Sequence, residues 1–440
     1  MATPPIKSRA VPAGRIARLA GFGRLAGGLA GAVIGGGART LARGQRPDLP
    51  SLLLTPANAR RLADELARLR GAAMKLGQLM SMDSGDLLPP ELAEVLARLR
   101  ADAEPMPERQ LRGQLDAAWG TGWESRLFQR FQWRPIAAAS IGQVHRATLL
   151  DGRDVAIKVQ YPGVRASIDA DVDNVATLVK LSGLVPAGLD LAPLLGEAKR
   201  QLHEEADYLR EGDCLERFGT LLAGREPFVV PGRVAALSTA DVLVMDHVAG
   251  VAIEGLTALP QAARDAAITA LMELLLAELF EFGLMQTDPN FANYRYRLND
   301  GRIVLLDFGA TRAVPPALAA GYRGILRAGV AGDHAGMAVA MEQMGVLPPG
   351  AVRLRETVLA MADEAFLPLR SGGDFDFGAS DVAQRLAGQS RQLAALRAEF
   401  AVPPADLLFI QRKFGGMYLL ASRLKARVAV APLLARWLAD

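Results

Sequence analysis

The chain has 440 residues, of which 50% are hydrophobic and 22% are charged. This composition excludes a disordered protein, and the length exceeds a single domain of about 100 to 200 residues. The formal net charge of +3 excludes the strong basic field that predicts nucleic-acid binding. The single cysteine, Cys214, excludes an intramolecular disulfide, and we interpret it as a small, partly buried hydrophobic residue.

Residues 1–50 are basic and rich in Gly and Ala. They contain no acidic residue before Asp48, and an uncharged run, LAGGLAGAVIGGGA, lies between Arg24 and Arg39. As a helix this run would span about 20 Å, short of the roughly 30 Å hydrocarbon core of a bilayer. We therefore predict a membrane-associating or flexible segment. A mitochondrial transit segment stays open, as does a helix packed through glycines at every fourth position, which are Gly27, Gly31 and Gly35.

Residues 51–125 are predicted to form a helical extension. Thr55 and Pro56 supply an N-cap hydroxyl and a first-turn proline, and apolar residues then recur at spacings of three and four. Lys75 and Gln78 lie off this apolar face in the string MKLGQLMS, and their spacing makes them neighbours on a second face. On these residues alone, a solvated lysine and glutamine are the alternative.

Residues 126–250 are predicted to form a nucleotide-binding lobe, and the segment from Phe131 to Gly163 within it has the pattern of a β-meander. Asp151 and Gly152 form a hairpin turn. In the strand that follows, Lys158 alternates with apolar residues and points to the opposite face from Val155, Ile157 and Val159. The string VAIK is the kinase motif whose lysine pairs with the α- and β-phosphates of a nucleotide.

The hairpin before this strand is predicted to cover the phosphates. Kinases place glycines there so that backbone amides can approach the nucleotide. Here the residues are mostly alanines, which leave less room and predict an altered nucleotide pose. The predicted nucleotide-binding residues of this hairpin are Ala137, Ala138, Ala139 and Ser140.

An acidic stretch from Glu197 to Phe218 is predicted to be one helix that carries the glutamate partner of Lys158. Glu204, Asp207 and Glu211 are spaced so that their carboxylates would share a face of this helix. Lys158 and Lys75 are the cations that could compensate these negative charges. A solvated acidic stripe is the alternative.

The apolar run VLVMDHVAG, Val242 to Gly250, reads as a buried strand that leads into a turn. In a kinase it would be the connector between lobes, whose backbone binds adenine. Met245 would line the back of the base pocket, and Asp246 and Val248 belong to the same predicted nucleotide-binding segment.

Residues 251–440 are predicted to form a helical lobe that carries the catalytic loop. A buried helix from Leu271 to Leu284 is followed by MQTDPNFANYRYRLNDGRIVLLDFGATR, in which Asn299, Asp300 and Gly301 predict a turn between two strands. Asp288 and Asn293 have the spacing of the kinase catalytic loop, in which the aspartate faces the phosphoryl acceptor and the asparagine binds Mg²⁺. Asp307, in the string DFG, would be the second metal ligand. No APE string follows, so a peptide-docking platform is not predicted. Near the C-terminus, QRKFGGMYLLASRLKAR is predicted to be an amphipathic helix with a basic flank and a mainly structural role.

Six ordered strings resemble the UbiB family of atypical kinase-like proteins, in the branch that supports coenzyme Q biosynthesis. They are KLGQ, AAASIGQVH, VAIKVQYPGV, EADYLRE, MQTDPNFAN and LLDFGATR. The resemblance begins near Leu52 and runs to the C-terminus. It implies an α+β, bilobal protein-kinase-like fold with an N-terminal helical extension and a helical C-terminal lobe.

The resemblance also implies roles for particular residues. Lys75 and Gln78 would belong to a regulatory extension, and Glu205 with Asp207 would form the acidic motif that engages it. Glu211 would be the helix glutamate that pairs with Lys158. The spacing argument selects Glu204 in place of Glu205, so the two interpretations differ by one position.

The implied activity is that of an atypical kinase or ATPase with ATP and Mg²⁺ as cofactors. The implied partners are the membrane surface, isoprenoid quinone precursors and other quinone-biosynthesis proteins, with a homodimer left open and no nucleic acid. The expected location is cytoplasmic and peripheral to the inner membrane, or on the matrix side in a mitochondrion. A true kinase for a small molecule or protein and a nucleotide-binding scaffold without turnover are the alternatives.

Overall fold

The computed structural model describes residues 105–139, 141–181, 192–348, 350–370, 372–395 and 405–438. The predictions for residues 1–104, including Lys75 and Gln78, and for Ser140 lie outside these ranges. Contacts divide the chain into two units. The first ends at Asp213 and resumes over Gly232–His247, and the second comprises Cys214–Pro231 and Val248–Asp440.

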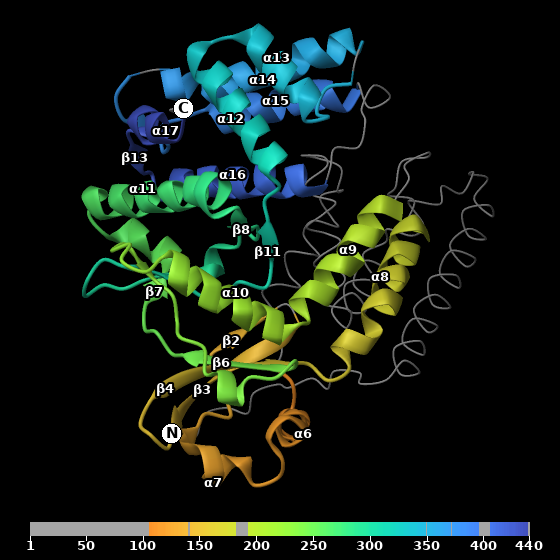
Figure 1. Cartoon of the computed structure of the whole chain (residues 1–440), viewed down its shortest axis with the longest axis vertical. Helices are drawn as coiled ribbons and strands as arrows, with labels where there is room; N and C mark the ends of the chain where they lie inside the picture. Colours follow the sequence, from red (N-terminus) through yellow and green to blue (C-terminus); the bar gives the residue numbers. More distant parts are fainter. Residues whose placement is uncertain are drawn as a thin grey trace, which may run out of the picture. The chain divides into compact units, whose positions relative to one another are not determined.

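The first unit is built on an antiparallel sheet with the strand order β1-β3-β4-β6, in which β2 also pairs with β3 (Figure 1). Its strands are β1 (Phe128–Phe131), β2 (Ala137–Ala138), β3 (Gly142–Leu149), β4 (Asp154–Gln160) and β6 (Val242–Asp246). The predicted turn between β3 and β4 is confirmed. Gly152 adopts φ +88° and its N–H donates to the Leu149 carbonyl at 2.9 Å, a conformation that glycine reaches without strain.

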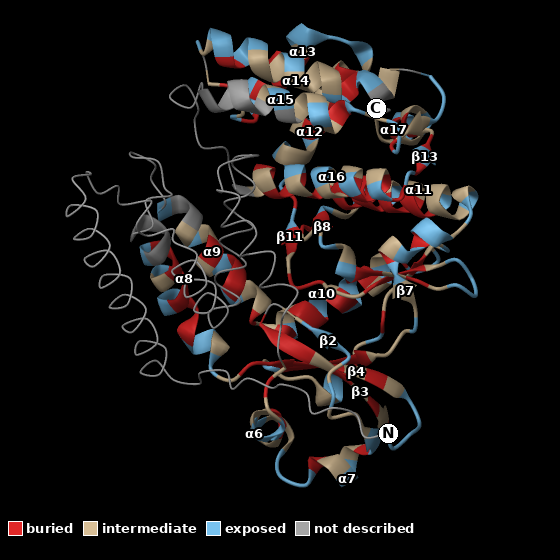
Figure 2. Ribbon diagram, turned by 180° about the vertical axis from the view of Figure 1, so that it is seen from behind, coloured by how far each residue is buried: buried red, intermediate tan, exposed pale blue. Residues whose placement is uncertain are grey.

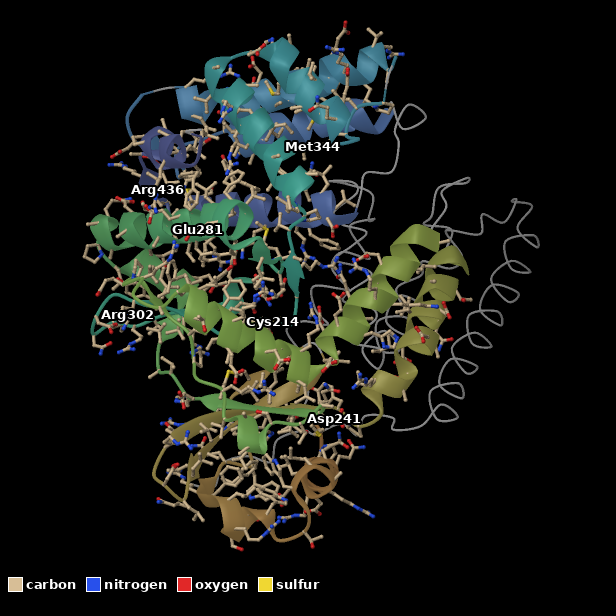
Figure 3. The ribbon with its side chains drawn as sticks, viewed as in Figure 1. Cys214, Asp241, Glu281, Arg302, Met344 and Arg436 are labelled. Carbon is tan, nitrogen blue, oxygen red and sulfur yellow. The ribbon has the colours of Figure 1, made fainter. Side chains whose placement is uncertain are left out.

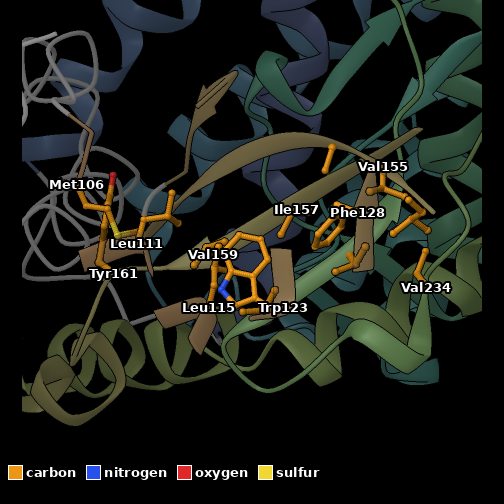
Figure 4. Close-up of a cluster of buried hydrophobic side chains, with 14 residues drawn as sticks. Met106, Leu111, Leu115, Trp123, Phe128, Val155, Ile157, Val159, Tyr161 and Val234 are labelled. Atoms are coloured by element: carbon orange, nitrogen blue, oxygen red, sulfur yellow. The ribbon is translucent and has the colours of Figure 1, made fainter. Parts of the chain in front are cut away.

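The core of the first unit lies under one face of this sheet. Val155, Ile157 and Val159 alternate along β4 and are fully buried, as predicted. Helices α6 (Glu108–Trp119) and α7 (Trp123–Leu127) supply Leu111, Leu115 and Trp123 to the same cluster (Figure 4). Trp123 also packs edge-on against the aromatic rings of β1, so residues before position 126 share a core with the strands.

A buried hydrogen-bonded chain crosses β3 and links it to residues on either side. The Met106 N–H donates to Gln143 Oε1 at 2.9 Å, and Gln143 Nε2 lies 2.7 Å from His145 Nε2. His145 Nδ1 lies 2.8 Å from the Gln132 carbonyl oxygen. All donors and acceptors match if the imidazole is neutral with its proton on Nδ1. His145 is therefore a core residue whose hydrogen bonds are satisfied.

We expect His145 to make the first unit sensitive to acid. Burial lowers the pKa of His145 from 6.5 to about 4, despite the opposing hydrogen bond to Gln132. Because the folded pKa lies below the unfolded one, the associated stability is present above pH 6.5 and is lost as pH falls toward 4. The linkage amounts to about 3 kcal/mol.

Urea denaturation followed by tryptophan fluorescence tests this, since three of the four tryptophans lie in the first unit. His145→Gln should flatten the decline in stability between pH 6.5 and pH 4. His203→Gln is the matched control, because His203 is an exposed histidine of the same unit, and it should leave the decline intact. An equally steep decline in His145→Gln would show that another group is responsible.

Three helices lie between β4 and β6 in the chain, and α8 and α9 lie side by side in Figure 1. They are α8 (Val164–Leu181), α9 (Ala192–Glu205) and α10 (Tyr208–Leu221), the last of which continues into the second unit at Cys214. Cys214 is partly buried on α10 (Figure 3).

The predicted single helix from Glu197 to Phe218 is wrong, because the chain breaks between α9 and α10. In a continuous helix the Ala206 carbonyl would accept from the Arg210 N–H. Instead Gln160 Nε2 donates to that carbonyl at 2.8 Å, and the Arg210 N–H donates to Asp207 Oδ1 at 3.2 Å. Asp207 therefore caps a new helix. Glu204 and Glu211 lie on different helices and do not share a face.

The second unit has short strands and many helices. The strands are β5 (Phe228–Val229), β7 (Val251–Ala252), β8 (Leu284–Gln286), β9 (Tyr294–Tyr296), β10 (Ile303–Leu305), β11 (Thr311–Ala313), β12 (Phe375–Asp376) and β13 (Arg427–Val428). They form one sheet of order β5-β10-β9-β7 and the two pairs β11-β8 and β12-β13. Arg302, labelled in Figure 3, donates to the Phe228 carbonyl at 2.7 Å and helps to join β5 to β10.

The buried helix predicted from Leu271 to Leu284 is confirmed, but both of its predicted ends are wrong. It begins ten residues earlier, at Gln261, and Leu284 already belongs to β8. It is α11 (Gln261–Ala277), coloured as buried along one side in Figure 2, and it continues as a π-helical turn, η3 (Glu278–Phe282). The 3-10 turns η2 (Ile253–Ala258) and η4 (Phe291–Asn293) precede α11 and β9 respectively. The turn predicted between β9 and β10 is also present, with Gly301 at φ +71°.

The predicted helical tail is present from Pro316 onward. Its helices are α12 (Pro316–Ala331), α13 (His334–Gln343), α14 (Val352–Arg370), α15 (Val382–Ala395), α16 (Ala405–Arg423) and α17 (Val430–Leu438). Helices α12 to α15 pack together, and α16 lies beside α11 (Figures 1 and 2). Over the described ranges, none of the helices combines the length and apolar character that a membrane crossing requires.

Candidate active site

A buried lysine–glutamate pair is the main polar feature of the first unit. Lys158 Nζ lies 2.8 Å from both carboxylate oxygens of Glu211, and their side chains are 9% and 1% exposed. Lys158 is on the face of β4 opposite the core, and Glu211 is in the first turn of α10. Asp207 begins that helix one turn earlier, so the helix break places Glu211 where it meets the lysine. The ring of Tyr208 lies 5.0 Å from the ammonium.

The alanine hairpin lies at the start of β3. Ala137 and Ala138 are exposed, and the Ala139 N–H donates to the Gly142 carbonyl at 2.9 Å. Gly142 permits this turn, because a side-chain carbon there would collide with the carbonyl oxygen of Val159. The backbone at the hairpin base is therefore held against the strand that carries Lys158.

The other residues predicted to bind nucleotide occupy the end of β6. Met245 is buried in the strand, whereas Asp246 accepts from the Gly232 N–H at 3.1 Å through its carboxylate. The backbone of Asp246 also donates to the Gly232 carbonyl at 2.8 Å. Asp246 thus has a clear role in joining β6 to the preceding loop, and Val248 is the first residue of the second unit after this strand.

In the second unit, one short loop brings Asp288 and Asn293 together. Asn293 Nδ2 donates to Asp288 Oδ2 at 3.2 Å, and the Asn290 N–H donates to Asp288 Oδ1 at 3.3 Å. Asn290 caps η4 through its side chain, which closes the loop just before β9. The five-residue spacing read from the sequence therefore corresponds to a direct side-chain contact.

Asp307 follows β10 and lies near the same loop through backbone pairing. The Leu306 N–H donates to the Asn293 carbonyl at 3.0 Å, which puts Asp307 beside Asn293. Asp307 Oδ1 accepts from the Gly309 N–H at 3.0 Å. Phe308 is buried and its ring lies 4.8 Å from that of Phe218, which anchors the DFG string in the core of the second unit.

The side-chain oxygen atoms of Asn293 and Asp307 are of the type that binds a magnesium ion. Because Asn293 uses its amide nitrogen to bind Asp288, its amide oxygen is directed away from that carboxylate. One amide oxygen and the carboxylate of Asp307 are hard ligands, and Mg²⁺ takes few such protein ligands together with phosphate oxygens and water. The residues present therefore suit the metal that the motif predicts.

Arg412 is a functional candidate that the sequence reading missed. Its guanidinium lies 3.5 Å from Asp288 Oδ1, and both side chains are largely buried. Arg412 is on α16, in the string QRKFGG, which the sequence suggested to be mainly structural. Gly416, one turn later, lies so close to Pro289 that a side-chain carbon there would collide with the proline ring. The signal in the sequence was the pair of glycines, Gly415 and Gly416, that closely follows Arg412 and Lys413.

The acidic residues assigned to the regulatory motif are at the α9–α10 break. Asp207 lies 3.9 Å from Arg165, whereas Glu204 bonds Arg200 at 3.1 Å. Glu205 is half-buried and is the last residue of α9. The prediction that Glu204 shares a face with Glu211 is wrong, because the helix break separates them. The proposed contacts with Lys75 and Gln78 lie outside the described residues.

A lysine–glutamate pair on an antiparallel sheet, and an Asp–Asn loop followed by DFG in a helical unit, define a protein of kinase-like α+β, bilobal fold. The family model of the "ABC1 atypical kinase-like domain" matches residues 98–341, which are more than half of the chain. The chain belongs to this ABC1 family of atypical kinases, the UbiB family that its motifs predicted.

Several curated proteins are similar over nearly the whole chain. The mitochondrial atypical kinase COQ8B of Danio rerio is 38% identical over 429 residues, covering 96% of this chain and 68% of that protein. COQ8B of Rattus norvegicus is 37% identical over 96% of this chain and 80% of its own length. The mitochondrial atypical kinase COQ8 of Saccharomyces cerevisiae is 35% identical over 97% of this chain and 85% of its own length.

One solved structure supports the fold independently. Rv3197 of Mycobacterium tuberculosis, solved in a complex with erythromycin, superimposes with a TM-score of 0.59 at 27% sequence identity. The match covers 87% of this chain and 95% of that one.

Proposed function

We propose that this protein is a Mg²⁺-dependent ATP-binding atypical kinase with ATPase activity, and that it supports coenzyme Q biosynthesis at a membrane surface. The observation that carries the proposal is the pairing of Lys158 with Glu211 in one unit, with Asp288, Asn293 and Asp307 gathered in the other. Each set has the residue types and contacts that phosphoryl-transfer sites use. Their order in the chain is that of the kinase motifs.

In this proposal Lys158 binds the α- and β-phosphates, and Glu211 orients its ammonium. Both carboxylate oxygens of Glu211 hold the lysine at 2.8 Å, so the side chain has little freedom to leave its position. The backbone of the hairpin at Ala137 to Ser140 covers the phosphates. Met245 and the backbone around Asp246 and Val248 contact the base.

Asn293 and Asp307 would hold Mg²⁺, which when bound neutralises charge that develops on the transferred phosphoryl group. Asp288 accepts the proton of the attacking water or hydroxyl as the new P–O bond forms and the bond to the β-phosphate oxygen breaks. The hydrogen bond from Asn293 orients one oxygen of Asp288. Arg412 places a positive charge 3.5 Å from the other oxygen of Asp288.

The relatives support the biological role that we propose, because they are named as mitochondrial atypical kinases of the COQ8 type. We assign this chain to the same process, acting on membrane-bound isoprenoid quinone precursors or on the proteins that process them. The acid-free residues 1–47 suit an anionic membrane surface. Lys75 and Gln78, with Glu205 and Asp207, would regulate access to the nucleotide.

Phosphate release from Mg-ATP by the purified full chain tests the proposal. We expect hydrolysis that rises with vesicles containing an anionic phospholipid and not with neutral vesicles. Quinone profiling of a deletion strain complemented with wild type should show recovery of coenzyme Q. No hydrolysis above background with any vesicle would contradict the proposed ATPase.

The same assays separate the two alternatives. Stoichiometric transfer of radiolabelled phosphate to a separate acceptor would identify a true kinase. Full complementation by Asp288→Asn, together with ATP-induced thermal stabilisation, would identify a scaffold without turnover. Among the described residues, no contact favours either alternative over the ATPase.

A further inference from the structure

A buried polar cluster lies directly behind the loop that carries Asp288 and Asn293. At its centre is Lys413 of α16, whose side chain is 3% exposed. Its ammonium donates to the Gln286 carbonyl at 2.7 Å, to Gln286 Oε1 at 3.0 Å and to the Tyr294 hydroxyl at 3.0 Å. Burying a lysine in this way is costly unless its charge and its donors are satisfied.

The partners of Lys413 flank the loop at both ends. Gln286 ends β8, two residues before Asp288, and Tyr294 begins β9, immediately after Asn293. One ammonium therefore bonds to the residue before the loop and to the residue after it. The distance between those two anchor points is set by a group 127 residues away in the sequence.

Glu278 supplies the negative charge of the cluster. It lies in the π-helical turn η3, is 1% exposed, and places Oε2 3.5 Å from Lys413 Nζ. Its other oxygen accepts from the Gln286 N–H at 3.3 Å. Burial raises the pKa of Glu278 to about 7, although the Lys413 charge opposes the shift. Glu278 thus compensates the positive charge of Lys413. Like Lys413, it is also hydrogen-bonded to Gln286.

Two explanations of Lys413 make different predictions. If the lysine only neutralises Glu278, removing both charges should restore everything that removing one destroys. If the lysine instead holds the loop, removing both charges still leaves Gln286 and Tyr294 without the hydrogen bonds that fix them. The contacts favour the second explanation, because all three hydrogen bonds go to Gln286 and Tyr294. The close approach of Gly416 to Pro289, inside the loop, shows that this helix is fitted to the loop itself.

We propose that Lys413 is a positioning residue for the catalytic loop, holding Asp288 and Asn293 in their reactive spacing by fixing both ends of the loop from α16. The kinetic part of this proposal rests on the proposed ATPase activity. The structural part, the order of residues 287–293, does not.

The decisive variant is the double substitution Glu278→Gln with Lys413→Met in the full chain, because it leaves no unpaired charge in the cluster. Lys413→Met alone should lower the Tm strongly, and the double variant should recover most of that loss. Its kcat for Mg-ATP should remain about 100-fold below wild type, the cost of a misplaced reacting group. Its affinity for ATP in EDTA should be unchanged.

Tyr294→Phe is a milder companion, since it removes one of the three hydrogen bonds and keeps the ring. Tyr294→Phe should lower kcat by less than the double variant does, and it should leave the Tm unchanged. Arg423→Met is the matched control, because Arg423 is a largely exposed cation at the C-terminal end of α16 and should change neither quantity.

Hydrogen–deuterium exchange of the full chain gives a readout that needs no activity. Peptides covering 284–296 should exchange faster in the double variant than in wild type, while peptides of α12 stay unchanged. If wild type hydrolyses no ATP, the proposed function fails, and the exchange result alone decides the role of Lys413. Wild-type exchange over 284–296 in the double variant would overturn the inference, as would a wild-type kcat in an active protein.

Discussion

Replacing Lys158 by methionine is expected to destabilise the first unit by about 3 to 5 kcal/mol, the usual effect of leaving a buried ion-pair partner alone. Glu211 is 1% exposed and both of its oxygens bond to the lysine, so its carboxylate would remain in the interior without its cation. The same substitution should abolish measurable ATP binding if Lys158 meets the phosphates. Urea denaturation followed by tryptophan fluorescence measures the first effect, and calorimetric titration with ATP measures the second.

The double variant Lys158→Met with Glu211→Leu separates the two effects. Removing both charges should restore most of the lost free energy of unfolding, because no buried charge is left unpaired. ATP binding should not return. Lys199→Met is the control, since Lys199 pairs with the exposed Asp173 in the same unit and should cost at most about 1 kcal/mol. ATP binding that survives in the double variant would show that Lys158 is a structural residue.

Asp307→Asn is expected to reduce Mg-ATP hydrolysis by about 100- to 1,000-fold with little change in stability. The substituted side chain keeps an oxygen that can accept from the Gly309 N–H, so the turn after β10 should persist. The asparagine lacks the negative charge with which Asp307 would bind the metal. Steady-state phosphate release across a Mg²⁺ titration, with circular dichroism for the fold, provides the measurement.

Asp300→Asn is a suitable control for this substitution. Asp300 lies in the turn between β9 and β10 and accepts from the Arg302 N–H at 3.3 Å, so it occupies a comparable turn of the same sheet. Its substitution should leave hydrolysis within about twofold of wild type, as expected for a surface change. Equal losses in the two variants would indicate a general effect on the sheet and argue against a metal ligand at Asp307.

The residues of the site that could be predicted from the sequence are those specified by local motifs. Lys158 was found because strand alternation and the VAIK string agree, and the five-residue spacing of Asp288 and Asn293 proved to be a direct contact. The turns at Gly152 and Gly301 were also local and correct. Each of these depends on residues within one strand, turn or loop.

What the sequence could not supply depends on contacts between distant residues. The α9–α10 break arises because Gln160, 46 residues earlier, takes the carbonyl of Ala206, and helix propensity alone favours continuing through that position. Lys413 and Arg412 appeared to be an ordinary basic flank of an amphipathic helix. Their roles emerge only when α16 is seen against the loop from Gln286 to Tyr294.

We propose that Lys158 binds the phosphates of ATP and that Asp307 binds the Mg²⁺ ion that accompanies ATP. Calorimetric titration of ATP, with Mg²⁺ and with EDTA, into wild type, Asp307→Asn and the Lys158→Met/Glu211→Leu variant tests this most directly. We predict that Mg²⁺ strengthens binding to wild type by about tenfold, that is about 1.4 kcal/mol. Asp307→Asn should lose only that gain, and the lysine variant should lose binding in both conditions. A Mg²⁺ gain retained in Asp307→Asn, or ATP binding unaffected by loss of Lys158, would contradict the account.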